Sequence, residues 1–235
     1  MKLLALVTAA LLFPQEKNEA EALLDKVADK VAKAKTFQCS SSIAIHHPQG
    51  HFTAEQSFLL AEGNKLRFEM KVAKPGGEEK KQLIVSDGSK LHVVLPETKT
   101  RDTPADLNLD VLTMIPRVCL MGAVEAAAIQ VLGGVKAMEG LVFSDFKLEK
   151  SEKVGEREIR ILVYKIKQTQ PTRAVQSIDA VCKLWVDAAS LLPVKRELTM
   201  KWGDKGDAIW TETFTDTKLD EKIDPAKFEL PKEAK

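Results

Sequence analysis

Residues 65–72, KLRFEMKV, alternate strictly between charged and apolar side chains. Leu66, Phe68, Met70 and Val72 would therefore share one face of a β-strand, and the charged side chains would share the other. The same period of two recurs from residue 37 to residue 94, interrupted by HHPQGH, EGN, KPGGEE and the Asp-Gly pair at 87–88. Five successive strands joined by such short turns predict an antiparallel meander.

A helical period comes before this meander, in NEAEALLDKVADKVAKAKTF. Leu24, Val27 and Val31 recur at helical spacing, with Asp and Lys on the opposite side. Asn18 is placed to cap the helix, and Glu21 follows three residues later, as a capping box requires. The pattern predicts one amphipathic helix lying against an apolar surface.

The period changes again at residues 103–140, which are rich in Leu, Met and Ala. Pro104 and Pro116 would break this insert into short helices. It carries more apolar side chains than a single helix stripe can bury, so we expect it to lie across the sheet as a lid. Alternation then resumes, with turns near Gly155 and at 187–190, giving about ten strands and one domain over residues 19–235.

An alternating sheet of this size has an apolar face that must be covered. The mostly β fold that best suits the inventory is a curved antiparallel sheet, an incomplete β-barrel, with helices in its concavity. Its interior would be lined by Ile43, Phe58, Leu66, Phe68, Met70, Leu83, Val85 and Leu91. Periodicity leaves open whether that interior is packed solid or hollow, and composition alone favours a solid core.

Composition excludes some function classes. Lys plus Arg (35) almost cancel Asp plus Glu (34), and the charges are interspersed. A nucleic-acid binder usually carries a basic excess, so we expect no nucleic-acid partner. There is one Tyr and there are three Trp, too few for base-stacking platforms.

The N-terminus carries an unbroken apolar run, residues 3–13, after one Lys. This run is too short to span a bilayer but suits the apolar region of a signal peptide. We therefore expect residues 1–18 to be a signal peptide and the protein to be exported, to a periplasm or elsewhere. The alternative is an apolar N-terminal strand or helix of a cytosolic protein.

Candidate chemistry is sparse. Cys39, Cys119 and Cys182 are far apart without a CxxC motif, so buried thiols are expected, although export allows one disulfide with one Cys left over. His46, His47 and His51 are the best metal candidate, but no carboxylate or Cys supports them, and neighbours 46 and 47 would point to opposite faces. We expect an exposed polar turn, no metal or other cofactor, and no enzymatic activity.

Four stretches together resemble the LolA-like periplasmic lipoprotein carriers. They are KLRFE at 65–69, IVSDG at 84–88, WVDAASLLPVK at 185–195 and DPAKFELP at 224–231. Each motif alone is weak, but their order and spacing extend over nearly the whole chain after the leader. The resemblance implies an apolar cavity under a helical lid that takes acyl chains of lipoproteins or lipids, which favours a hollow interior.

The resemblance also implies site residues and partners. Met114 would join the ligand-binding lining, and Arg67, which alternation places on the solvated side, would hold the lid through its fixed fork of donors. Met70, Met114, Met121 and Met200 would either adapt to varied chains or simply fill the core. Partners would be lipid or lipoprotein acyl chains and membrane-bound donor and acceptor proteins, bound by a monomer. The competing hypotheses are a sensor or interaction module on the same fold and a metal-dependent enzyme using the three histidines.

Overall fold

The computed structural model describes residues 18–48, 50–73, 76–77, 79–94, 98–117, 140–168, 179–201, 204 and 206–231. The expected signal peptide, Cys119, Met121 and most of the second half of the helical insert lie outside these residues, as does the side chain of Met114.

The leading helix α1, Glu19–Ala32, begins where its sequence predicts. The side chain of Asn18 accepts a hydrogen bond from the Glu21 backbone N–H (2.9 Å), which satisfies one of the amides that the first helical turn leaves open. Leu23, Leu24, Val27 and Val31 are buried along one stripe. The predicted cap and apolar face are both confirmed.

In the part of the chain that the structure describes, twelve strands follow in one antiparallel sheet. They are β1 (Thr36–His47), β2 (Gly50–Ala61), β3 (Lys65–Ala73), β4 (Lys80–Asp87), β5 (Lys90–Val94), β6 (Thr98–Asp102), β7 (Leu141–Leu148), β8 (Glu152–Val154), β9 (Arg157–Gln168), β10 (Asp179–Asp187), β11 (Pro193–Lys201) and β12 (Asp207–Leu219). The short helix α2, Leu107–Met114, separates β6 from β7, and a 3-10 turn, η2 (Pro225–Phe228), follows β12.

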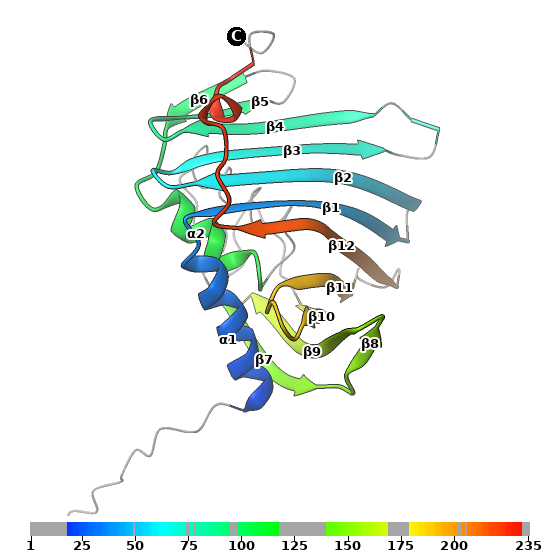
Figure 1. Ribbon diagram of the computed structural model, residues 1–235. Coiled ribbons are helices and arrows are strands. Elements are labelled where there is room, and N and C mark those ends of the chain that lie inside the picture. Colours follow the sequence, from blue (N-terminus) through cyan, green and yellow to red (C-terminus); the bar gives the residue numbers. More distant parts are fainter. Residues whose placement is uncertain are drawn as a thin grey trace, which may run out of the picture.

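The spatial order is β6-β5-β4-β3-β2-β1-β12-β11-β10-β9-β7, with β8 paired to β9. Two meanders are thus joined where the first strand pairs with the last, Ile43 opposite Glu212. Among the described strands, β6 and β7 end the order without pairing to each other, so the sheet does not close. Figure 1 shows the first meander running across the upper half of the molecule and the second below it. The predicted incomplete barrel is confirmed.

One face of this sheet carries both helices, and we call it the inner face. The register places Ile43, Glu212, Arg196, Leu184 and Leu162 side by side along it, across both meanders. Val111, Leu112 and Ile115, in α2 and at its C-terminal cap, pack there in one cluster with buried residues of β1–β5. α1 packs chiefly in a second cluster with β9 and β10. The two helices also touch each other, so they form a joint cover.

In the described part of the helical insert, the helix ends at the proline that was predicted from the sequence to break it. α2 ends at Met114, with Ile115 as its cap, directly before Pro116. Pro116 has no backbone N–H to donate to the Leu112 carbonyl, so the series of helical hydrogen bonds stops there. The sequence predicted about ten strands, and the two that it missed are the short strands β6 and β8.

Candidate functional site

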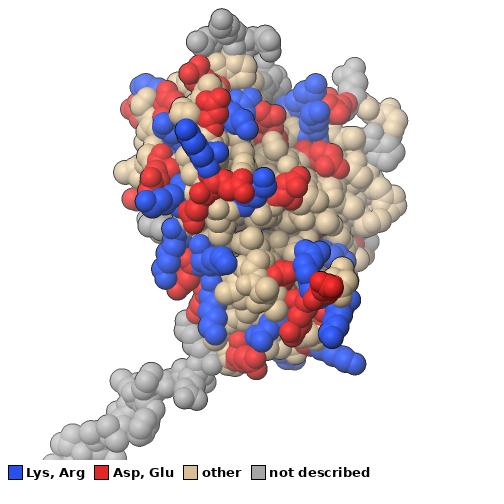
Figure 2. All heavy atoms as spheres, in the orientation of Figure 1, with Lys and Arg blue, Asp and Glu red and all other residues tan. Residues whose placement is uncertain are grey.

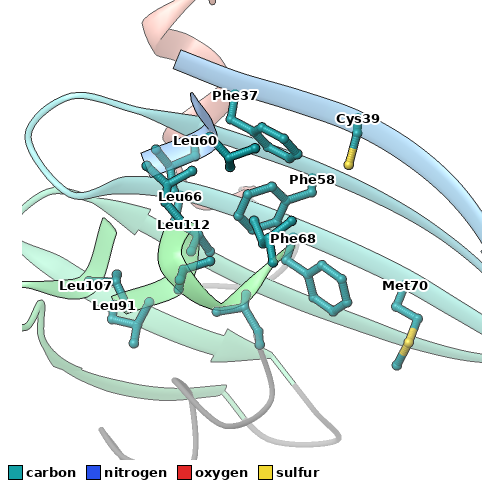
Figure 3. Close-up of a cluster of buried hydrophobic side chains, with 14 of the residues drawn as sticks. Phe37, Cys39, Phe58, Leu60, Leu66, Phe68, Met70, Leu91, Leu107 and Leu112 are labelled. Atoms are coloured by element: carbon teal, nitrogen blue, oxygen red, sulfur yellow. The ribbon is translucent and has the colours of Figure 1, made fainter. Parts of the chain in front are cut away.

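The first apolar cluster lies where α2 covers β1–β5. Figure 3 shows Phe37, Phe58 and Phe68 grouped beside Leu112 of α2. The rings of Phe37 and Phe58 meet edge to face, with centroids 5.6 Å apart. Full burial of each such side chain contributes roughly 1.5–3 kcal/mol, so this cluster is a main source of stability.

Six of the expected lining residues belong to this cluster, each 2% exposed or less: Ile43, Phe58, Leu66, Phe68, Met70 and Leu91. They come from β1, β2, β3 and β5, and they face the cover. Their placement in the interior follows from strict alternation in the sequence. Their role in binding a ligand stays a prediction.

Leu83 and Val85 do not line this interior, and that expectation is wrong. In the β3–β4 register Val85 lies opposite Arg67 and Leu83 opposite Glu69, whereas Ile84 lies opposite Phe68. Cross-strand partners share a face, so Ile84 enters the cluster and its two neighbours lie on the outer face. The cause is a one-residue ambiguity, because three consecutive apolar residues carry no alternation.

The second apolar cluster lies under α1. It contains Ala20, Leu23, Leu24 and Val27 of the helix and Leu162, Tyr164, Ile166, Ala180, Cys182, Leu184 and Val186 of the sheet. Phe146 of β7 stacks on Tyr164 with ring centroids 5.8 Å apart. Met200 packs against this cluster and is partly buried.

A buried polar network crosses the inner face between the two clusters. Gln56 Nε2 donates to Ser41 Oγ (2.5 Å) and to Glu212 Oε1 (2.7 Å). Arg196 pairs with Glu212, Nη1 to Oε2 at 3.3 Å, and both side chains are at most 2% exposed. Arg196 Nη2 also donates to the carbonyl of Ile115 at 2.6 Å, so the network ends at the C-terminus of α2.

The two described cysteines flank this network as free, buried thiols. Burial raises the pKa of Cys182 to about 11, against a smaller lowering by the Arg196 charge. Burial also raises the pKa of Cys39 well above its usual value, and the Glu212 carboxylate adds to the effect. A thiol that stays protonated is a poor nucleophile, so neither group suits catalysis. The expectation of plain buried thiols is confirmed for these two residues.

Further hydrogen bonds fasten the cover at both ends of α2. At its start, Asn108 Nδ2 donates to the Ala61 carbonyl (2.6 Å), and Asn64 Nδ2 donates to the Ala105 carbonyl (2.7 Å). Beyond its end, Tyr164 Oη donates to the Arg117 carbonyl (2.7 Å). Between these points the described contacts of α2 with the inner face are apolar.

Arg67 does not hold this cover, contrary to what the resemblance implied. Its Nη1 donates to the Lys227 carbonyl (3.0 Å) and to the Glu229 carbonyl (3.4 Å), and its Nε donates to Glu69 (2.5 Å). These contacts fasten η2 to the outer face. Arg196 makes the contact with α2 instead. The sequence could have indicated this role, because Arg196 is two residues before Leu198 and so shares its face of the strand, where alternation predicts an apolar side chain.

A pocket of about 690 Å³ lies on the outer face, beside η2. Its lining includes Gln38, Cys39, Ser40, Ser57, Leu59, Arg67, Glu69, Asp216, Lys218 and Lys227. The cross-strand register puts Gln38, Leu59 and Arg67 in one row of this face. Most of these residues are polar or charged, and only Cys39 also belongs to the apolar cluster under α2. In Figure 2 positive and negative side chains are mixed across the visible surface, as the sequence indicated.

The histidines of the β1–β2 hairpin divide between the two sides of the sheet. His46 and His51 are direct cross-strand partners, and His47 is opposite Gly50. Within the residues that the structure describes, no group of three or more His, Cys, Asp and Glu side chains is placed to hold a metal ion.

Comparison with known proteins gives structural likeness only. The sequence matches no family model and no curated protein. LprF from Mycobacterium bovis aligns with 88% of this chain and 95% of its own, at 8% identity and a TM-score of 0.48. A chain of the Pseudomonas aeruginosa MucA/MucB complex aligns with 91% of this chain and 62% of its own, at 15% identity and a TM-score of 0.43. A DUF1329 family protein from Desulfovibrio piger aligns with 91% of this chain and 98% of its own, at 12% identity and a TM-score of 0.34.

The described helices are all too short or too polar to cross a membrane.

Proposed function

We propose that the protein binds lipid or lipoprotein acyl chains between the inner face and its helical cover, as an exported carrier. The observation that carries this proposal is the construction of the interior. Its lining is aromatic and aliphatic, and its cover over β1–β5 is a two-turn helix fastened by polar contacts at its ends. Such a cover can detach without unfolding the sheet, because the sheet makes its own backbone hydrogen bonds.

The energetics suit a carrier that takes up and releases its cargo. Each methylene transferred from water contributes about 0.8 kcal/mol, so ten would contribute about 8 kcal/mol before ordering costs. That corresponds to roughly micromolar affinity. Aromatic residues and Met70 offer a lining without fixed polar partners, which suits chains of varied length.

Displacement of a fluorescent fatty acid by palmitate tests this proposal. Ala54 lies on the inner face, paired with Ile43, and Ala44 lies on the outer face, paired with Thr53. Ala54→Leu adds volume to the packed interior and should weaken binding about tenfold, since overpacking costs about 1–3 kcal/mol. Ala44→Leu adds the same atoms outside and should leave binding unchanged. A wild-type protein that binds neither probe at tens of micromolar would overturn the proposal.

A second candidate is an interaction module on the same fold, without cargo. The observation in its favour is the near-complete burial of Phe58, Phe68 and Ile115, which already fill the space beneath the cover. Native mass spectrometry separates the two candidates. A carrier should retain lipid after gentle purification, whereas a module should appear at the mass of the polypeptide alone and fail to take up added fatty acid.

A further inference from the structure

We propose that His46 and His51 form a two-histidine binding site for a divalent first-row transition-metal ion, on the outer face of the β1–β2 hairpin. The sequence has three histidines within six residues. His46 and His47 are consecutive in a strand, so their side chains point to opposite faces and cannot bind one ion together. This objection does not apply to His46 and His51, which the hairpin places opposite each other on one face.

The register supplies the geometry. His46 lies directly opposite His51, and the turn beyond His47 and Gly50 fixes that pairing. The two imidazole rings have centroids 4.7 Å apart and planes 77° from each other. Both side chains are exposed, so an ion from solution can reach them.

The register partners around the two rings are uncharged. The next cross-strand pair on the same face is Ala44 with Thr53, and the β12 partner of His46 is Ile209. None of these three side chains carries a charge that would compete for the ion or repel it.

The chemistry selects the class of ion. Neutral imidazole suits Cu²⁺, Ni²⁺ and Zn²⁺, and affinity at a given nitrogen site rises toward Cu²⁺. Two protein ligands form a chelate in which water occupies the remaining positions. The described residues bring no third His, Cys, Asp or Glu into the group, so this is an exposed, exchangeable site and not a closed structural one.

The chelate also bridges two strands. An ion that binds both rings adds a cross-link between β1 and β2 near their turn, and it stabilises the folded state by mass action, because the unfolded chain does not hold the two rings together. Binding should therefore raise the melting temperature as well as register by calorimetry.

Calorimetric titration of the full chain, prepared without a histidine tag, with CuCl₂, NiCl₂ and ZnCl₂ tests the proposal. The wild type should bind one ion, with Cu²⁺ tightest. His51→Asn should weaken binding by at least about tenfold, because loss of a direct ligand should cost no less than loss of an outer-shell partner. His47→Asn, one position away and opposite Gly50, is the matched control and should bind like the wild type.

Two outcomes would overturn the proposal: equal binding by the wild type and His51→Asn, or equal losses in the two variants. Circular dichroism melting without metal checks that each variant folds, and His46→Asn supplies an independent removal of the other ring. Electron paramagnetic resonance of the Cu²⁺ complex should show two coordinated imidazole nitrogens in the wild type and in His47→Asn. A spectrum with the same nitrogen count in His51→Asn would assign the ion to another site.

Discussion

At the scale of single residues, the inner face contains an ion pair where the sequence pattern expects apolar side chains. Glu212 lies in phase with Trp210 and Phe214, and it pairs across the strands with Arg196. Two opposite charges, each at an apolar phase of its own strand, were a readable signal of a buried pair. Their pairing itself could not be read, because it depends on which strands become neighbours.

Removing one partner of this pair should be costly. Arg196→Met leaves the Glu212 carboxylate buried without its cation and frees the Ile115 carbonyl. We expect about 3–5 kcal/mol lower free energy of unfolding, measured by urea denaturation. The double variant Arg196→Met with Glu212→Leu removes both charges and should recover much of that loss. A single variant as stable as the wild type would show that the pair is not buried in solution.

Asp187 makes the stability depend on acid. Its Oδ1 accepts from the Ser190 backbone N–H (2.7 Å), the Ala189 N–H (3.1 Å) and Ser190 Oγ (2.9 Å), and these donors, the Ser190 amide first, lower the pKa of the carboxyl. A lowered folded-state pKa adds stability above the unfolded value, about 3.9, and that stability is lost as pH falls through the folded value.

Denaturation at a series of pH values checks this contribution. Asp187→Asn should be less stable than the wild type at neutral pH, and the difference should shrink as pH falls below about 4. Asp29→Asn, at an exposed position of α1, is the control and should leave the profile close to that of the wild type. A gap between Asp187→Asn and the wild type that stays constant down to pH 2 would contradict the assignment.

At the scale of elements, the sequence predicted those whose period was clear. α1 with its cap, the strands β1–β3 and the turn at residues 187–190 needed only hydrophobic period and turn residues. Periodicity did not predict β6, because its sequence, TKTRD, is exposed throughout and has no apolar alternation. Only its pairing with β5 makes it a strand. β4 was assigned the wrong face because its apolar run is continuous.

The turn between β4 and β5 offers an element-scale test. Gly88 has a φ of +101°, and a Cβ there would lie 2.4 Å from the Gly63 carbonyl oxygen in the β2–β3 turn. Gly88→Ala must therefore separate two turns that support the start of α2. Gly155→Ala, at φ +64° with no atom within 4 Å, carries backbone strain alone.

Urea denaturation of the two variants should rank them. The Gly155 variant should lose about 1–2 kcal/mol from left-handed backbone strain, and the Gly88 variant clearly more. Equal losses would mean that the contact between the turns is not maintained in solution.

At the scale of the whole molecule, the open curved sheet with helices on one face followed from counting strands and helices. What the sequence did not decide was the content of the interior. Periodicity identifies which face is apolar, but it does not give the distance between a cover and a sheet. Within the described residues the space beneath α2 is filled by side chains, so a cargo would enter by displacing that helix.

The seam between β1 and β12 has a consequence for how this interior comes into being. Without β12, β1 and β11 would each have one unpaired edge, and the two meanders would be separate sheets. The last strand therefore joins the two meanders into one sheet, and it brings Glu212 to Arg196, whose guanidinium bonds the Ile115 carbonyl at the end of α2. The buried ion pair thus forms only once the whole chain is present, although the apolar cluster under α2 draws its buried sheet residues, among those described, from β1–β5 alone.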